Sequence, residues 1–194
     1  MADGIDLSHS ELRSLITKAA RGAGLAWGLA EEAGWAAEWL ARRGFPAADW
    51  AAHWLSSAVA GGPTPVALGV ALADDFAKGP APFPPQSLPD ALLAPGYLLP
   101  FLARIAQNRG DLALTTTLGL AAEIGADGTL RFGPAWSDRT LGWTLAQVVT
   151  EVAGQRPRVS TSVLDCLDGL ALRTTVPPSD LSRRQAGSAT PDDD

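Results

Sequence analysis

Apolar residues recur with the period of an α-helix over most of the first sixty residues. Ser8 and Glu11 form an S-x-x-E capping box, and apolar residues follow it at spacings of three and four. This pattern predicts an amphipathic helix over residues 8–21. Gly22 and Gly24 come directly after it and predict the end of that helix.

Two further helices are predicted before the Gly61-Gly62-Pro63 break. The first runs from about Gly28 to Arg43, with small apolar residues along one stripe and arginines in the last turn, where they oppose the helix dipole. Gly44 suits the left-handed position after a helix, and Pro46 opens the third helix. Because the connections are short, the three helices are predicted to pack together as a small bundle.

Three more helical segments are predicted downstream, at residues 66–76, 97–108 and 161–173. The first is also compatible with a buried strand, because a short apolar run fits both structures. Pro100 falls in the first turn of its helix, where proline is tolerated, and Gly110 follows as a cap.

The pattern changes to strict alternation over residues 112–124, which predicts β structure, and a further strand is predicted over residues 141–149. Asp127-Gly128 marks a hairpin turn. A two-residue loop would set Ile124 against Arg131, which would place a charged residue on the apolar face.

A three-residue hairpin loop from Ala126 to Gly128 is therefore predicted. It pairs Ile124 with Leu130 and Ala122 with Phe132, so that apolar side chains share one face of the sheet. Gly128 would take the left-handed position that such a loop requires.

Together these elements predict an α+β protein in which an N-terminal three-helix bundle packs against a small antiparallel sheet with additional helices. Residues 79–89 hold five prolines and are predicted to be an extended connector. It would separate a helical lobe at residues 1–78 from a mixed α/β lobe at 90–176, which a polar tail at 177–194 follows. A single compact domain is the alternative, because 194 residues suffice for either arrangement.

Five of the seven tryptophans lie in the first sixty residues. Such rings either fill a core or form an exposed patch that binds a partner. Core positions are predicted for Trp27 and Trp35. The candidates for an interaction surface are Trp39, Trp50 and Trp54, because three such rings around two helix ends exceed what one small bundle usually buries.

Composition narrows the class of protein. The net charge of −6 disfavours the phosphate backbone of a nucleic acid as a partner. No uninterrupted apolar run approaches the ~20 residues that span a bilayer, and residues 1–6 do not resemble a signal peptide. The single cysteine, Cys166, excludes an intramolecular disulfide and fits a reducing compartment. A cytoplasmic protein without nucleic-acid or membrane partners is expected.

The sequence carries no recognisable catalytic motif. His9 and His53 are the only histidines, and with one cysteine they give no metal-ligand spacing. Glycine-rich nucleotide loops, a G-x-S-x-G nucleophile turn and an H-E-x-x-H helix are all missing from the sequence. No catalytic residue, metal site or cofactor is therefore predicted.

A polar cluster near the C-terminus is the candidate ligand site. Arg173, Thr174, Ser179 and Arg183 combine guanidinium and hydroxyl groups, which bind carboxylate or phosphate. The same groups could instead tie the tail to the domain through backbone hydrogen bonds.

A second candidate is the pair Lys18 and Arg21, which lies beside the Gly22–Gly24 turn. The alternative interpretation is a solvated helix end whose cations oppose the helix dipole.

Both ends of the chain resemble one protein family. The run Ala171-Leu172-Arg173-Thr174-Thr175-Val176-Pro177, with Ser182-Arg183 and three closing aspartates, resembles the end of the bacterial family DUF3726. The run from Lys18 to Gly24, followed by Trp27 to Ala33, resembles its start. Thr175 stands where the family commonly has tyrosine. The resemblance implies a bacterial protein and carries no defined activity.

Two functional hypotheses follow. The first is a cytoplasmic, non-catalytic accessory or interaction module that binds a protein partner, or a second copy of itself, through its tryptophan-rich helices. The alternative is a binding protein or enzyme for a small anionic metabolite, held by Arg173 and Arg183 between the lobes. The sequence leaves open whether the protein is an enzyme.

Overall fold

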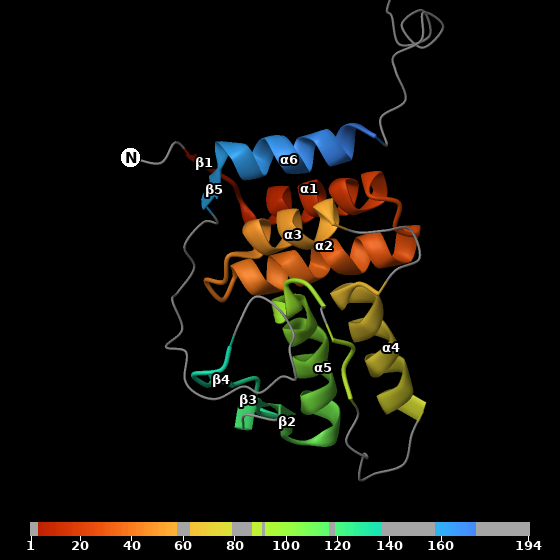
Figure 1. The fold of residues 1–194 in the computed structure, drawn as a ribbon, viewed down its shortest axis with the longest axis vertical. Helices are drawn as coiled ribbons and strands as arrows, with labels where there is room; N and C mark the ends of the chain where they lie inside the picture. Colours follow the sequence, from red (N-terminus) through yellow and green to blue (C-terminus); the bar gives the residue numbers. More distant parts are fainter. Residues whose placement is uncertain are drawn as a thin grey trace, which may run out of the picture.

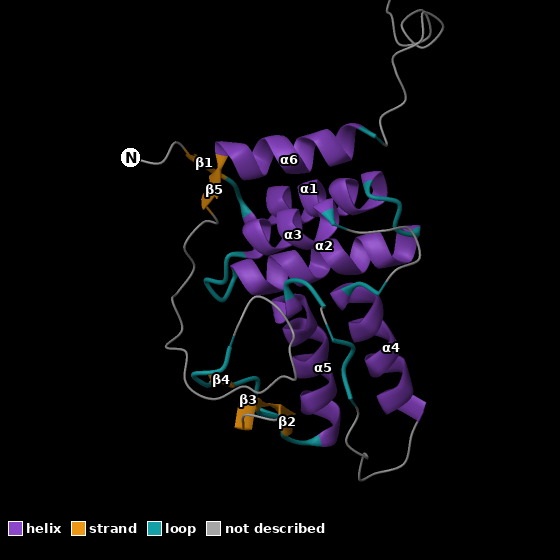
Figure 2. Ribbon diagram, in the orientation of Figure 1, coloured by secondary structure: helices purple, strands orange, loops and turns teal. Residues whose placement is uncertain are grey.

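The structure is a computed structural model and describes residues 4–57, 63–78, 87–90, 92–116, 119–136 and 158–173 (Figure 1). The helices are α1 (His9–Gly22), α2 (Trp27–Ala41), α3 (Ala47–Ser56), α4 (Pro65–Lys78), the 3-10 helix η1 (Pro95–Leu98), α5 (Leu99–Arg109) and α6 (Thr161–Leu172). The strands are β1 (Gly4–Asp6), β2 (Leu112–Thr116), β3 (Gly119–Ile124), β4 (Leu130–Phe132) and β5 (Arg158–Ser160). Helices and small antiparallel sheets together confirm the predicted α+β class (Figure 2).

The predicted N-terminal bundle forms, and α6 joins it. Helices α1, α2 and α3 pack on one another, while α6 lies against α1 and α3 (Figure 1). The capping box is present, because the Glu11 N–H donates to Ser8 Oγ at 3.2 Å and the Ser8 N–H donates to Glu11 Oε2 at 2.7 Å. Gly44 has a φ of +76°, which confirms the left-handed residue predicted after α2.

Small residues let the helices of the bundle approach closely. A Cβ added at Gly34 of α2 would lie 2.1 Å from Thr17 Oγ1 of α1. A Cβ added at Gly22 would overlap the carbonyl group of Leu170 in α6. Alanines of α1 and α2 fill the same interfaces and are fully buried, namely Ala19, Ala20, Ala30, Ala33, Ala36 and Ala37.

A second layer of helices packs beneath the bundle. Helix α4 contacts α2, η1 and α5, and it settles the ambiguous segment as a helix (Figure 1). Tyr97 of η1 is fully buried, and its hydroxyl donates to the Ala47 carbonyl of α3 at 2.8 Å. The largest fully buried side chains come from both layers and include Tyr97, Phe101, Leu12, Ile16, Leu40 and Leu55.

The three-stranded sheet β2-β3-β4 follows α5. Strands β3 and β4 pair Ile124 with Leu130 and Ala122 with Phe132, which confirms the predicted register. The Gly125 N–H donates to the Thr129 carbonyl at 2.8 Å, and Gly128 has a φ of +85°. The three-residue loop is thus confirmed.

The alternating run 112–124 is two strands rather than one. Strands β2 and β3 pair antiparallel, with Leu112 opposite Ile124. The alternation of apolar residues hid the break, because Leu112, Leu120 and Ile124 keep the same phase on both sides of it. Gly119 begins β3 with a φ of +129°, a conformation that glycine adopts readily.

Strands β1 and β5 form a separate antiparallel pair, in which Ile5 lies opposite Val159. Neither was predicted, since strands of three residues carry too little periodicity. The predicted strand at 141–149, most of the proline-rich connector and the tail at 177–194 lie outside the described residues. The division into lobes therefore stays a prediction. Among the described residues, no helix is both long and apolar enough to cross a membrane.

Candidate functional site

Trp54 does not belong to an exposed surface, so this part of the predicted interaction surface is wrong. Its side chain is 2% exposed and packs edge-on against Tyr97, with ring centres 5.6 Å apart. The physical reason is that η1 and α6 both pack against α3, and Tyr97 of η1 lies against this ring. Within the described part of the chain, its indole Nε1 meets no hydrogen-bond partner.

Trp39 and Trp50, the other two predicted surface residues, are half-buried. The guanidinium of Arg43 lies 3.8 Å from the centre of the Trp39 ring. Trp50 stacks on Phe45 with ring centres 5.8 Å apart, and it lies against the backbone of Gly96, where a Cβ would be 2.1 Å from the ring. Their role as an interaction surface remains a prediction.

Trp50 is part of an aromatic cluster that joins α3 to the sheet. Trp136 lies 6.0 Å from Trp50 and 4.9 Å from Phe132, and Phe132 lies 5.5 Å from Phe45 (ring centres). The four rings come from two separate stretches of the chain, residues 45–50 and 132–136. Their pairs are stacked, edge-on or tilted, at the centre-to-centre distances that aromatic pairs prefer. This cluster explains why Trp50 is only half-exposed.

Trp27 was predicted in the core, and the structure shows it at the surface with 63% of the residue exposed. The reason is its place in the fold: it is the first residue of α2, directly after the α1–α2 turn, so it extends past the contact between the two helices. Trp35, also predicted in the core, is half-buried and packs edge-on against Phe101, with ring centres 5.3 Å apart.

Trp27 lies at one end of the helix bundle, together with the end of α6 (Figure 1). The guanidinium of Arg21 lies 5.7 Å from the Trp27 ring centre and donates to the Leu25 carbonyl. The neighbouring Gly22 abuts Leu170, two residues before Leu172. Leu172 is 67% exposed. Two large apolar side chains are therefore exposed at this end.

A groove of about 790 Å³ runs between α1 and α6 and reaches Leu172. It is lined by Ser10, Glu11, Ser14, Leu15, Lys18, Asp168, Ala171 and Leu172. Lys18, of the second candidate pair of the sequence, thus lines this groove with Leu172, and Arg21 precedes Gly22, which abuts Leu170 of α6. We call Lys18, Arg21, Trp27, Leu172 and Arg173 the Trp27 end.

Arg173 is the only residue of the predicted anion site within the described residues. It is exposed and forms the C-cap of α6. Thr174, Ser179 and Arg183 lie outside the described part of the chain, so the proposed pairing of Arg173 with Arg183 stays a prediction. Sequence analysis gave Arg173, Lys18 and Trp27 three separate interpretations. The structure places all three at one end of the bundle.

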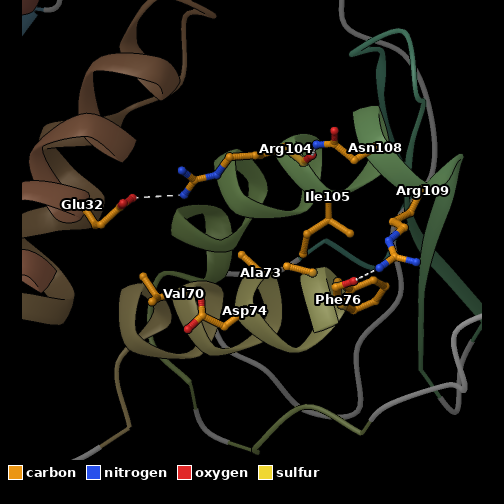
Figure 3. Close-up of a pocket in the computed structure, with 10 residues that line it drawn as sticks. Glu32, Val70, Ala73, Asp74, Phe76, Arg104, Ile105, Asn108 and Arg109 are labelled. Carbon is orange, nitrogen blue, oxygen red and sulfur yellow. Dashed lines mark hydrogen bonds and ion pairs between the residues drawn. The ribbon is translucent and has the colours of Figure 1, made fainter. Parts of the chain in front are cut away.

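A second cavity, of about 480 Å³, lies between α4 and α5 and extends to Glu32 of α2 (Figure 3). Arg104 donates to Glu32 Oε2 at 3.2 Å, and Arg109 donates to the Phe76 carbonyl. Sequence analysis missed this site, because its lining residues come from three helices and form no local motif.

Over the described residues, no group of three His, Cys, Asp or Glu side chains could hold a metal ion. The side chains at the Trp27 end are apolar or basic, and the Arg21 guanidinium lies over the Trp27 ring.

Comparison with known proteins gives one match. Residues 7–74 match the family DUF3726. The description of DUF3726 is "Protein of unknown function", and the match extends from the start of α1 into α4. The predicted resemblance to DUF3726 is thus confirmed for these residues, which include Lys18, Arg21 and Trp27 of the Trp27 end. Neither the curated proteins nor the solved structures contain a match to the chain.

Proposed function

We propose that the protein is an accessory interaction module that binds a protein partner through the Trp27 end. One observation carries the proposal: Trp27 and Leu172, at the same end of the bundle, are 63% and 67% exposed. Large exposed apolar side chains gathered in one region are typical of interaction sites, and tryptophan is enriched among the residues that dominate binding energy.

Arg21 prepares this surface for binding. Its guanidinium lies over the Trp27 ring and is itself held by the Leu25 carbonyl. A ring held in this way loses less conformational freedom when a partner covers it, so more of the contact energy appears as affinity. The exposed indole and its neighbouring cation form one preorganised unit.

The charges of the Trp27 end indicate the chemistry of the partner. Lys18, Arg21 and Arg173 are basic, although the whole chain has a net charge of −6. No ion pair engages any of the three within the described residues. A segment that presents an apolar side chain flanked by Asp or Glu would complement this surface, and such complementarity speeds association.

The test is affinity capture from the native organism with matched variants of the full chain. Trp27→Ser and Leu172→Ser remove the exposed apolar groups of the Trp27 end. Ile5→Ser is the control, because Ile5 is 48% exposed on β1, at the opposite end of α1 (Figure 1). We expect a partner that the wild type and Ile5→Ser recover equally and that both other variants lose. Equal recovery by all variants, or capture of further copies of this chain alone, would overturn the proposal.

A further inference from the structure

The cavity between α4 and α5 is separate from the Trp27 end and has a different composition. Its floor is apolar, with Val70, Ala73 and Phe76 from α4 and Ile105 from α5 (Figure 3). Its volume of about 480 Å³ falls in the range of small-molecule sites. Charged groups from three helices surround this floor, so the cavity combines an apolar body with a polar rim.

Arg104 is oriented at this rim by two aromatic rings and a carboxylate. Its guanidinium lies 4.4 Å from the centre of the Trp35 ring and 5.5 Å from that of Phe101. Its Nη2 donates to Glu32 Oε2 at 3.2 Å (Figure 3). The Nε and Nη1 groups find no acceptor among the described residues, although a guanidinium offers five N–H donors. An oriented cation with unused donors therefore faces a ligand-sized cavity.

The remaining charges limit what this cation can hold. Arg109 donates to the Phe76 carbonyl, and Asp74 pairs with Lys78 at 3.6 Å. Glu32 and Asp74 would repel a second negative charge, whereas an uncharged ligand would make no charge-assisted hydrogen bond with Arg104. A single negative charge fits best.

We propose that this cavity binds a small monocarboxylate with an apolar body. The carboxylate accepts hydrogen bonds from the free edge of Arg104, which suits the planar geometry of both groups. The apolar body lies on Val70, Ala73 and Ile105. This site is independent of the proposed partner surface, since the two share no residue.

Hexanoate titrated into the full chain and followed by NMR is the test, with hexanamide as the uncharged probe of equal size. We expect saturable binding of hexanoate in the millimolar range and at least about tenfold weaker binding of hexanamide, because a charge-assisted hydrogen bond is lost. Arg104→Gln should lower hexanoate affinity to that of hexanamide. The control is Arg131→Gln, which removes an exposed arginine that pairs with Glu123 on the sheet at 3.5 Å.

A second variant tests whether hexanoate occupies the cavity itself. Ala73→Leu fills the cavity from α4 while it leaves Arg104 and Glu32 in place. We expect it to abolish hexanoate binding, whereas Trp27→Ser should bind hexanoate as the wild type does. Equal affinity for hexanoate and hexanamide, or equal hexanoate affinity in Arg104→Gln and Arg131→Gln, would overturn the proposal. So would undiminished binding in Ala73→Leu.

Discussion

The guanidinium of Arg21 lies 5.7 Å from the ring centre of Trp27, across the turn that joins α1 to α2. Each residue had a separate explanation in the sequence: Arg21 as a cation that opposes a helix dipole, and Trp27 as a core residue. In the structure they form one surface feature at the end of the bundle. This relationship is the basis for the docking surface that we propose at the α1–α2 turn, beside the surface of Trp39 and Trp50 that the sequence predicts.

The two tryptophans Trp27 and Trp54 should differ sharply in what they contribute to stability. Trp54→Ala removes a ring that is 2% exposed and should lower the free energy of unfolding by roughly 3–5 kcal/mol. Trp27→Ala removes a mostly exposed ring and one cation–π contact, so we expect a loss of about 1 kcal/mol or less. Urea unfolding of both variants measures the difference. Equal losses would mean that Trp27 is not exposed in solution.

Glycine substitutions should report how closely the helices pack. In Gly34→Ala the new Cβ would meet Thr17 Oγ1 at 2.1 Å and the Arg13 carbonyl oxygen at 2.7 Å, so α1 and α2 must move apart. We expect this variant to be destabilised, even though alanine favours a helix by about 1 kcal/mol over glycine. Gly169→Ala is the control, because nothing lies within 4 Å of its Cβ and α6 continues on both sides.

Gly169→Ala should therefore stabilise the protein by up to about 1 kcal/mol. Thermal or urea unfolding gives both values. If Gly34→Ala proved as stable as Gly169→Ala, the close contact between α1 and α2 would be wrong.

Tyr97 should make the protein sensitive to alkaline pH. Complete burial raises the pKa of Tyr97 well above its ordinary value of 10.0. The unfolded chain therefore loses this proton before the folded protein does, and the unfolded state binds fewer protons above that pH. Stability should be unaffected by Tyr97 below about pH 10 and should fall progressively above it.

Tyr97→Phe is the matched variant for this prediction. At neutral pH it should cost about 1 kcal/mol, because it leaves the Ala47 carbonyl without the hydrogen bond at 2.8 Å. Above pH 10 its stability should fall less steeply than that of the wild type. Parallel pH profiles of unfolding for the two proteins would contradict the burial of this hydroxyl.

Local signals in the sequence were sufficient to predict most of the fold. The Ser8–Glu11 capping box and Gly44 fixed the limits of α1 and α2, and the Ile124–Leu130 pairing followed from keeping apolar groups on one face. These features depend on neighbouring residues only. The break within residues 112–124 was missed because the apolar residues keep the same alternation on both sides of it. The pairing of β1 with β5 was missed because these strands lie far apart in the chain.

The candidate sites were harder to predict because exposure depends on tertiary contacts. Trp54 and Trp27 both sit on amphipathic helices, and only the packing of η1 and α6 on α3 decides that Trp54 is enclosed. One local signal for Trp27 was available: Gly24 and Gly28 flank it, which places the ring at a turn rather than mid-helix. The Arg104 cavity had no such signal, since three separate helices assemble it.

Site-specific photocrosslinking in living cells tests the docking surface most directly. The photoreactive residue p-benzoylphenylalanine would replace Trp27 in one sample and Ile5 in the other, so that the two ends of α1 are compared (Figure 1). We predict that position 27 crosslinks to another polypeptide, at a segment with an apolar residue flanked by Asp or Glu, and that position 5 does not. No crosslink from position 27, or one only to a second copy of this chain, would contradict the account.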